Sequence, residues 1–171
     1  MTWGMILHVW LAGVAAYSLF RAHGVAFYAS LVGGLAYMLS GMIAGLVSPG
    51  HDGKIFISAL FPLALLVLRL GIRDGRRWAW GALALVVGLG VLTPHPQLLQ
   101  YMLLACGAYA LWVAFAEGGE GAPPRSIALK RLGFALGAVM IGFAIGAIQF
   151  LPVLNYVGWS PRAGGAGWEH A

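Results

Sequence analysis

Six apolar runs alternate with short polar connections along the 171 residues of the chain. They lie near residues 5–20, 25–47, 55–70, 78–92, 98–116 and 132–152. A helix needs about 20 mostly apolar residues to cross a membrane. The third and fourth runs are short for this, but Arg69 and Trp78 can extend them as interfacial anchors. The pattern predicts an all-α, polytopic integral membrane bundle with about six transmembrane helices in one domain, residues 1–171. A re-entrant pair is the alternative for the two short runs.

Composition supports a bilayer as the main partner. The chain is 61% hydrophobic and 9% charged, and its mean hydropathy is +0.86. A soluble domain averages about 25% charged residues. The net charge of +5 comes from residues in the connections, so it indicates orientation and gives no reason to expect a nucleic-acid partner.

The basic residues are unevenly distributed between the two sides that six crossings would create. Eight of the ten Lys and Arg residues fall in the connections 21–24, 69–77 and 117–131, which would share one side. The positive-inside rule makes this side cytoplasmic. The 48–54 loop, the Thr93–Gln97 turn and a loop beginning at 153–171 are then extracytoplasmic.

The Thr93–Gln97 turn is the polar interruption between two long apolar runs. Pro94 disfavours helix at Thr93, and Pro96 suits the first turn of the next helix. His95 would therefore sit at a helix N-terminus, where backbone N–H groups attract anions. The turn predicts a site for a phosphate or carboxylate group. The alternative is a proline-built turn whose histidine faces water.

A second helix N-terminus is expected on the same side, after the 48–54 loop. It would add His51 and Lys54 to His95 and Gln97, and Gln149 would line the same outer cavity. Together these five residues suit a lipid-linked phosphate at the membrane surface. An ordinary polar loop is the alternative. No local spacing of metal ligands is present, so we expect neither a metal nor a cofactor.

Several further features indicate structural roles. The pairs Gly41/Gly45, Gly133/Gly137 and Gly142/Gly146 suit close helix packing. His8 suits a hydrogen bond between helices, and residues 117–124 suit a flexible linker. The spans contain no acidic residue, which weighs against an ion-coupled transporter. Neither a nucleophile elbow nor a zinc-protease motif is present, so no catalytic residue is assigned.

Four parts of the chain resemble the YfhO-type bacterial membrane proteins, a branch of the GT-C glycosyltransferase superfamily. The most specific is Thr93–Gln97, which is similar to their Gly-His-Pro-Gln turn. The others are His8–Arg21, Tyr37–Gly41, and Gln149–Pro152 followed by Ser160–Ala163. The resemblance implies a bacterial cytoplasmic (inner) membrane. It also implies transfer of a sugar from a polyprenyl-phosphate donor to an extracytoplasmic glycan acceptor.

Two departures from that family change the expectation. Pro94 replaces the usual glycine of the turn. The family also has an earlier helix and a first extracytoplasmic loop that bears the expected catalytic aspartate, and this chain begins after them. We therefore expect a partial GT-C-like module that is inactive alone and whose first helix lacks a packing partner. A lipid or polysaccharide transporter and a non-catalytic membrane scaffold are the alternatives.

Overall fold

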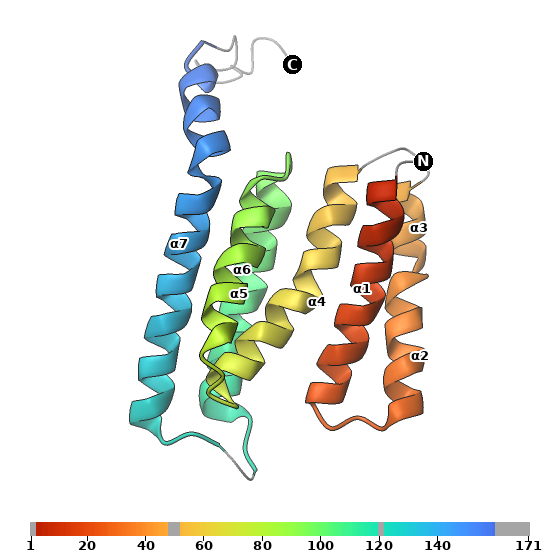
Figure 1. Cartoon of the computed structure of the whole chain (residues 1–171), viewed down its shortest axis with the longest axis vertical. Coiled ribbons are helices and arrows are strands. Elements are labelled where there is room, and N and C mark those ends of the chain that lie inside the picture. Colours follow the sequence, from red (N-terminus) through yellow and green to blue (C-terminus); the bar gives the residue numbers. More distant parts are fainter. Residues whose placement is uncertain (1–2, 48–51, 120–121, 160–171) are drawn as a thin grey trace, which may run out of the picture.

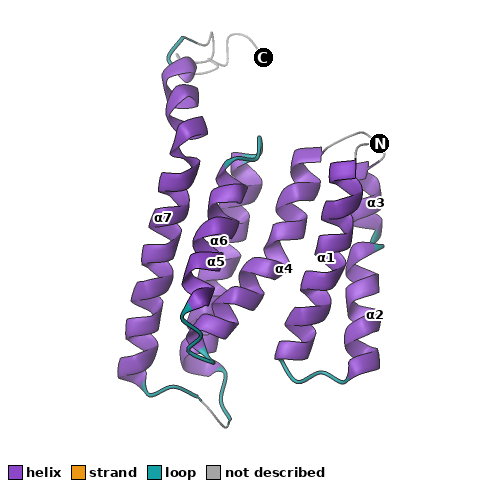
Figure 2. Ribbon diagram, viewed as in Figure 1, coloured by secondary structure: helices purple, strands orange, loops and turns teal. Residues whose placement is uncertain are grey.

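The computed structural model of the chain describes residues 3–47, 52–119 and 122–159. The described residues form helices and turns, with no strand among them (Figure 2). The elements are α1 (Trp3–Ala22), α2 (Phe27–Met38), α3 (Gly41–Val47), α4 (Asp52–Ile72), α5 (Trp78–Val91), α6 (Pro96–Leu111), the π-helical turn η1 (Trp112–Ala116) and α7 (Arg125–Val157). The predicted all-α polytopic bundle is confirmed.

The helices run up and down between two ends of the bundle (Figure 1). The connections after α1, α4 and η1 lie together at the lower end in this view, which we call the basic end. The α5–α6 turn and the start of α4 lie at the opposite end, which we call the His95 end. The prediction that the three basic connections share one side is therefore confirmed.

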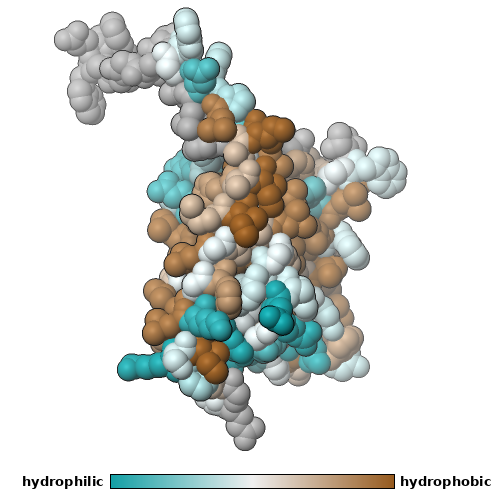
Figure 3. Space-filling model, turned by 60° about the vertical axis from the view of Figure 1, so that its left-hand side comes forward, coloured by the Kyte–Doolittle hydropathy of each residue, from teal (hydrophilic) through white to brown (hydrophobic). Residues whose placement is uncertain are grey.

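Within the described ranges, five helical segments are long and apolar enough to span a membrane, and α5 is a shorter apolar helix of 14 residues. The chain is thus a multi-pass membrane protein. Large apolar side chains cover much of the surface in Figure 3, whereas hydrophilic ones gather at the lower end of that face. The third run is not short, because α4 has 21 residues. It crosses the full bundle, and α5 returns beside it, which disfavours the re-entrant alternative.

The last helix extends beyond both predicted limits. With 33 residues, α7 is about 50 Å long at 1.5 Å per residue, against about 30 Å for a bilayer core. It continues through Pro152 to Val157, so residues 153–157 are helical instead of belonging to the expected loop.

The second apolar run is divided into two helices. α2 ends at Met38, and α3 begins at Gly41. The hydroxyl of Ser40 accepts a hydrogen bond from the Ile43 amide at 3.4 Å, which is the geometry of an N-cap. A serine with cap preference therefore accounts for the break in an otherwise continuous apolar stretch.

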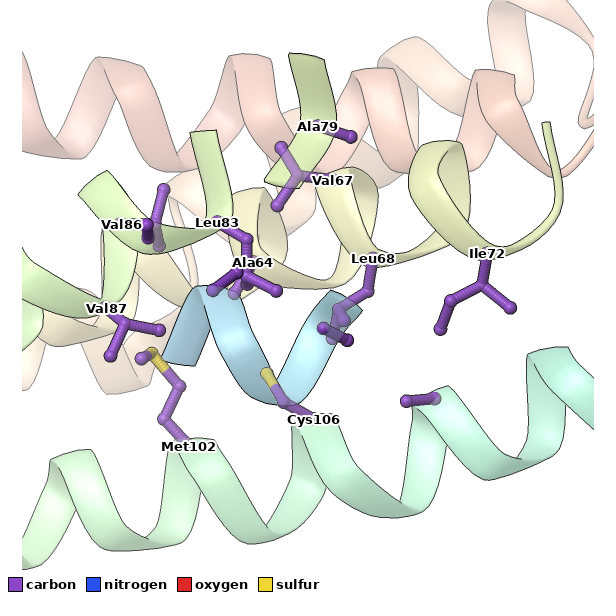
Figure 4. Close-up of a cluster of buried hydrophobic side chains, with 14 of the residues drawn as sticks. Ala64, Val67, Leu68, Ile72, Ala79, Leu83, Val86, Val87, Met102 and Cys106 are labelled. Carbon is purple, nitrogen blue, oxygen red and sulfur yellow. The ribbon is translucent and has the colours of Figure 1, made fainter. Parts of the chain in front are cut away.

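The main hydrophobic core lies among α4, α5, α6 and α7. In Figure 4, Met102 and Cys106 of α6 point toward Val87 of α5 and toward Ala64 and Leu68 of α4. The N-terminal hairpin, α1 with α2, adds a smaller buried cluster against α4. Because α1 packs along both α2 and α4, the expectation that it lacks a packing partner is wrong.

Only one of the three glycine pairs forms a packing face. A Cβ at Gly142 would lie 2.7 Å from Val87, and one at Gly146 would collide with Val91, so this pair lets α7 approach α5 closely. The pairs Gly41/Gly45 and Gly133/Gly137 face open space among the described residues. The packing prediction was therefore wrong for those two pairs.

Candidate functional site

The turn between α5 and α6 has the local structure that its prolines predict. α5 ends at Val91, and the buried Thr93 hydroxyl donates to the Gly90 carbonyl at 2.7 Å. His95 is the N-cap residue of α6, with φ −133° and ψ 74°, and Pro96 is the first helical residue. The His95 side chain makes no capping hydrogen bond within the described residues, so its ring nitrogens do not cap the N-terminus of α6.

The first turn of α4 lies directly against this turn. A Cβ built on Gly53 would lie 2.8 Å from Cδ2 of His95 and 2.8 Å from Cγ of Pro94. Only glycine allows this approach without movement of a proline ring or the imidazole. The prediction that two helix N-termini open at the same end, beside His95, is confirmed for α4 and α6.

The structure describes four of the five predicted binding residues. Lys54 follows Gly53 in the first turn of α4 and is half-buried. Gln97 is exposed on α6 and donates to the Tyr101 hydroxyl at 2.9 Å. Gln149 is half-buried on α7 and makes no hydrogen bond to Lys54 or His95 in the described part of the chain. His51 lies outside the described residues. The structure therefore places Lys54 one residue after Gly53, which contacts His95, and shows no hydrogen bond from Gln149 to either residue in the described part of the chain.

The groups that could attract an anion at this end are two helix N-termini and one lysine. The N-termini of α4 and α6 each carry a partial positive charge, and Lys54 adds a full one, which Asp52 at the start of α4 balances in the net charge. None of the carboxylates whose side chains are described forms an ion pair with Lys54 or His95. Among the described side chains, the arrangement can bind a phosphate oxygen but offers no acid–base pair.

A metal centre has no support in the described ranges. They contain no group of three His, Cys, Asp or Glu side chains placed to hold one ion. His8 makes no hydrogen bond between helices. Its Nδ1 instead lies 2.7 Å from the Gly4 carbonyl of its own helix, and its ring stacks on Phe56 of α4 at 4.0 Å between centroids.

The basic end holds a polar network that the sequence interpretation missed. Nε of Arg69 donates to Nδ1 of His23 at 3.3 Å, and Nη2 of Arg69 donates to Oε1 of Glu117 at 3.1 Å. Arginine has no acceptor, so Nδ1 of His23 must accept. The proton of the neutral ring is then on Nε2, which donates to the Tyr109 hydroxyl at 2.7 Å. This network joins the α1–α2 turn to α4, α6 and the end of η1.

Glu117 is the acidic centre of the network. Its side chain is 14% exposed, and Oε2 lies 4.0 Å from Nη1 of Arg73. Arg73 also donates to the backbone carbonyls of Glu117 and Gly118. The start of the 117–124 stretch is therefore held tightly, and the interpretation of Glu117 as part of a flexible linker was wrong.

The protonation of His23 depends on these neighbours. Burial lowers the pKa of His23 below its usual 6.5, and the charge of Arg69 lowers it further. The carboxylate of Glu117 opposes both effects. A protonated ring could not accept from Arg69 and would donate to Glu117 Oε1, 3.4 Å away, so protonation would rearrange the network.

A further arginine closes the basic end. Nη1 of Arg131, from α7, donates to the carbonyls of Ile72 at 2.6 Å and Arg73 at 3.0 Å. It thereby caps the C-terminus of α4, where a cation is favoured by the helix dipole. Gly75, with φ +69°, leaves room for the guanidinium group.

No family model, curated protein or solved structure matches the chain. The resemblance to YfhO-type proteins therefore stays a prediction. The geometry of the two ends is what supports a functional proposal.

Proposed function

We propose that the His95 end binds the phosphate of a polyprenyl-phosphate-linked sugar on the extracytoplasmic side of the membrane. In this proposal the chain is part of a GT-C-like glycosyltransferase. The observation that carries it is the contact of Gly53, in the first turn of α4, with His95 and Pro94. This contact supports the proposal because it brings the N-termini of α4 and α6 together, and Lys54 belongs to the first turn of α4.

Each group has a distinct role in the proposal. Lys54 supplies the charge that attracts the phosphate, and the His95 imidazole donates a hydrogen bond to a phosphate oxygen. Backbone N–H groups in the first turn of α4 complete the site. Pro96 has no N–H, so α6 contributes fewer donors than α4.

The chemical step needs a group that these residues do not supply. Sugar transfer requires a base to activate the acceptor hydroxyl while the carrier phosphate leaves. A carboxylate would serve, and no described carboxylate side chain pairs with Lys54 or His95. The proposal therefore assigns donor binding to this chain and leaves the catalytic residue unassigned.

Binding of a short-chain prenyl phosphate to the purified protein in nanodiscs tests the proposal. His95→Ala removes one hydrogen bond to a charged group and should weaken binding about ten- to a hundred-fold. His95→Gln should lose less, because an amide still donates. Gln100→Ala, at an exposed position of α6, is the control and should leave the affinity unchanged.

The matching prenol, which lacks the phosphate, separates headgroup recognition from chain partitioning. It should bind equally to wild type and to His95→Ala. Equal affinity of wild type for the prenol and the prenyl phosphate would contradict the proposal, and so would unchanged phosphate affinity in His95→Ala.

A further inference from the structure

A second ligand site is indicated at the other half of the molecule, by a cavity inside the four-helix part. Its volume is about 390 Å³, and side chains of α4, α5, α6 and α7 line it. The lining is apolar, with no charged or hydroxyl side chain. Its members are Ala64, Leu68, Leu83, Val87, Met102, Leu103, Cys106, Gly107, Ala110, Leu111, Leu132, Ala135, Leu136 and Val139.

The cavity lies in the half of the bundle next to the basic end. On α7 it extends from Leu132 to Val139, which is seven to fourteen residues after the helix begins at Arg125. At 1.5 Å per residue this is about 10 to 21 Å from the start of α7. On α4 its lining residues, Ala64 and Leu68, lie within two to three turns of the helix end at Ile72.

The cavity opens sideways, between α6 and α7. Leu111 and Leu136 belong to its lining and are 55% and 69% exposed. α6 packs mainly on α4, whereas α7 packs mainly on α5, so α6 and α7 have little direct contact. In a membrane this mouth faces the hydrocarbon region, because both rim residues belong to spanning segments.

The lining determines what chemical group can occupy the space. Water needs two to four polar partners to stay in a cavity, and this lining offers none from its side chains. A dry apolar cavity binds apolar ligands instead. Inside a bilayer, the group available at a lateral opening is the hydrocarbon chain of a lipid.

The charge of the basic end determines which lipid headgroup is favoured beside the cavity. Eight Lys and Arg residues and three acidic residues, Asp74, Glu117 and Glu120, belong to segments of the basic end, which gives +5. The other segments contain two basic and two acidic residues, which gives zero. The whole net charge of the chain therefore belongs to the end next to the cavity, and it would attract anionic lipids.

Arg125 links this charge to the cavity. It is exposed at the first position of α7. Leu132, Leu136 and Val139 follow it by 7, 11 and 14 residues, so at 100° per residue each of the three lies within about 40° of Arg125 around the helix. A phosphate held at Arg125 would thus have its hydrocarbon chain on the cavity side of α7.

We propose that this cavity binds one acyl chain of an anionic phospholipid from the leaflet at the basic end, with its headgroup at Arg125. This lipid is distinct from the proposed donor, whose phosphate lies at the opposite end. It would fill the space between α6 and α7 and join two helices that barely touch.

Photo-crosslinking tests the proposal on the full chain in nanodiscs. The probe is phosphatidylglycerol with a diazirine in the middle of one acyl chain, compared with the same probe built on phosphatidylcholine. We expect adducts concentrated on residues 102–111 and 132–139. Arg125→Gln should lower the preference for phosphatidylglycerol about five-fold, the effect of one basic residue near an anionic surface.

Gly107→Leu fills the cavity without a backbone clash, because a Cβ at Gly107 meets nothing within 4 Å. It should reduce labelling of residues 102–111 and 132–139 several-fold. Gly81→Leu is the matched control, since Gly81 is also exposed, also meets nothing within 4 Å and lies outside the cavity lining. It should label like wild type.

Two outcomes would overturn the proposal. Adducts spread evenly over the lipid-facing helices, unchanged in Gly107→Leu, would remove the cavity as a site. Equal labelling by phosphatidylcholine and phosphatidylglycerol in wild type would remove the anionic lipid as its occupant.

Discussion

The two ends of the bundle are held together by different interactions. At the basic end, side chains from distant segments bond to one another: His23 to Tyr109, Arg69 to Glu117, and Arg131 to the end of α4. Toward the His95 end, Tyr37 of α2 donates to the Ser58 carbonyl of α4 at 2.8 Å, whereas the hydrogen bonds of the side chains in and next to the α5–α6 turn are local, such as Thr93 to Gly90 and Gln97 to Tyr101. The elements there meet through the close contact of Gly53 with His95 and Pro94.

This difference predicts that the basic end contributes mainly to stability and the His95 end mainly to ligand binding. Ion pairs and hydrogen bonds at the basic end join the α1–α2 turn, α4, α6, the end of η1 and α7. The charge of Lys54 and the ring nitrogens of His95 have no described side-chain partner, so they remain available to a ligand. We therefore expect mutations at the basic end to change mainly the stability, and mutations at the His95 end to change mainly the binding of a phosphate.

Removal of Glu117 should have the largest effect. Glu117→Ala removes the carboxylate that Arg69 bonds at 3.1 Å, where the Arg69 side chain is only 12% exposed, and this should cost about 3 kcal/mol of unfolding free energy. Asp74→Ala is the control at the same end. Its ion pairs are long, at 3.8 and 3.9 Å, and Asp74 is 35% exposed, so the cost should stay below about 1 kcal/mol.

Unfolding of the purified variants in detergent measures both costs. The double variant Arg69→Met/Glu117→Met should lose less stability than Glu117→Ala, because no unpaired charge remains in that pair. Equally small losses of unfolding free energy in Glu117→Ala and Asp74→Ala would contradict the conclusion that the Glu117 network stabilises the basic end.

Two glycine substitutions compare the ends directly. Gly75→Ala should cost about 2 kcal/mol, because φ is +69° and the new methyl group displaces the Arg131 guanidinium. Gly53→Ala should cost about 1 kcal/mol through its 2.8 Å approach to Pro94 and His95. Only Gly53→Ala should also weaken prenyl-phosphate binding. Gly81→Ala is the control, because a Cβ at Gly81 meets nothing within 4 Å. Weaker prenyl-phosphate binding in Gly75→Ala would contradict the assignment of phosphate binding to the His95 end.

The pH dependence of stability should report His23 and is the smallest effect. Because the pKa of His23 is lowered in the folded chain, the unfolded chain binds more protons below about pH 6.5. The stability that the neutral His23 ring contributes is fully present above the pKa of His23 in the unfolded chain. It is lost as pH falls through the pKa of His23 in the folded chain. The groups facing His23 are Arg69, Glu117, Tyr109 and Trp112.

Melting temperatures between pH 5 and 7.5 measure this effect in wild type and in His23→Gln. Between pH 7.5 and pH 5, the melting temperature of wild type should fall more than that of His23→Gln. Parallel curves would mean that protonation of His23 does not act on the fold.

The sequence predicted the features that depend on neighbouring residues. The apolar runs placed the spans, and the two prolines placed His95 at the start of α6. Charge distribution predicted which connections share an end. These signals are local or additive, so no knowledge of packing was needed.

Features that depend on packing could not be predicted in the same way. Glycine spacing did not distinguish Gly142/Gly146, which face α5, from Gly133/Gly137 on the same helix, because spacing does not say where a neighbour lies. Glu117 follows a long apolar run, which was a signal for a buried partner. Its partners, Arg69 and His23, are 48 and 94 residues away in the sequence, and only the fold brings them together.

Single-cysteine labelling most directly tests the claim that the His95 end is extracytoplasmic and the basic end cytoplasmic. In a Cys106→Ala background, Gln97→Cys and Ser126→Cys place thiols at exposed positions of the His95 end and the basic end. A membrane-impermeant maleimide should modify Gln97→Cys in intact spheroplasts and Ser126→Cys only after lysis. The reverse pattern would contradict the account, because the proposed phosphate site would then face the cytoplasm.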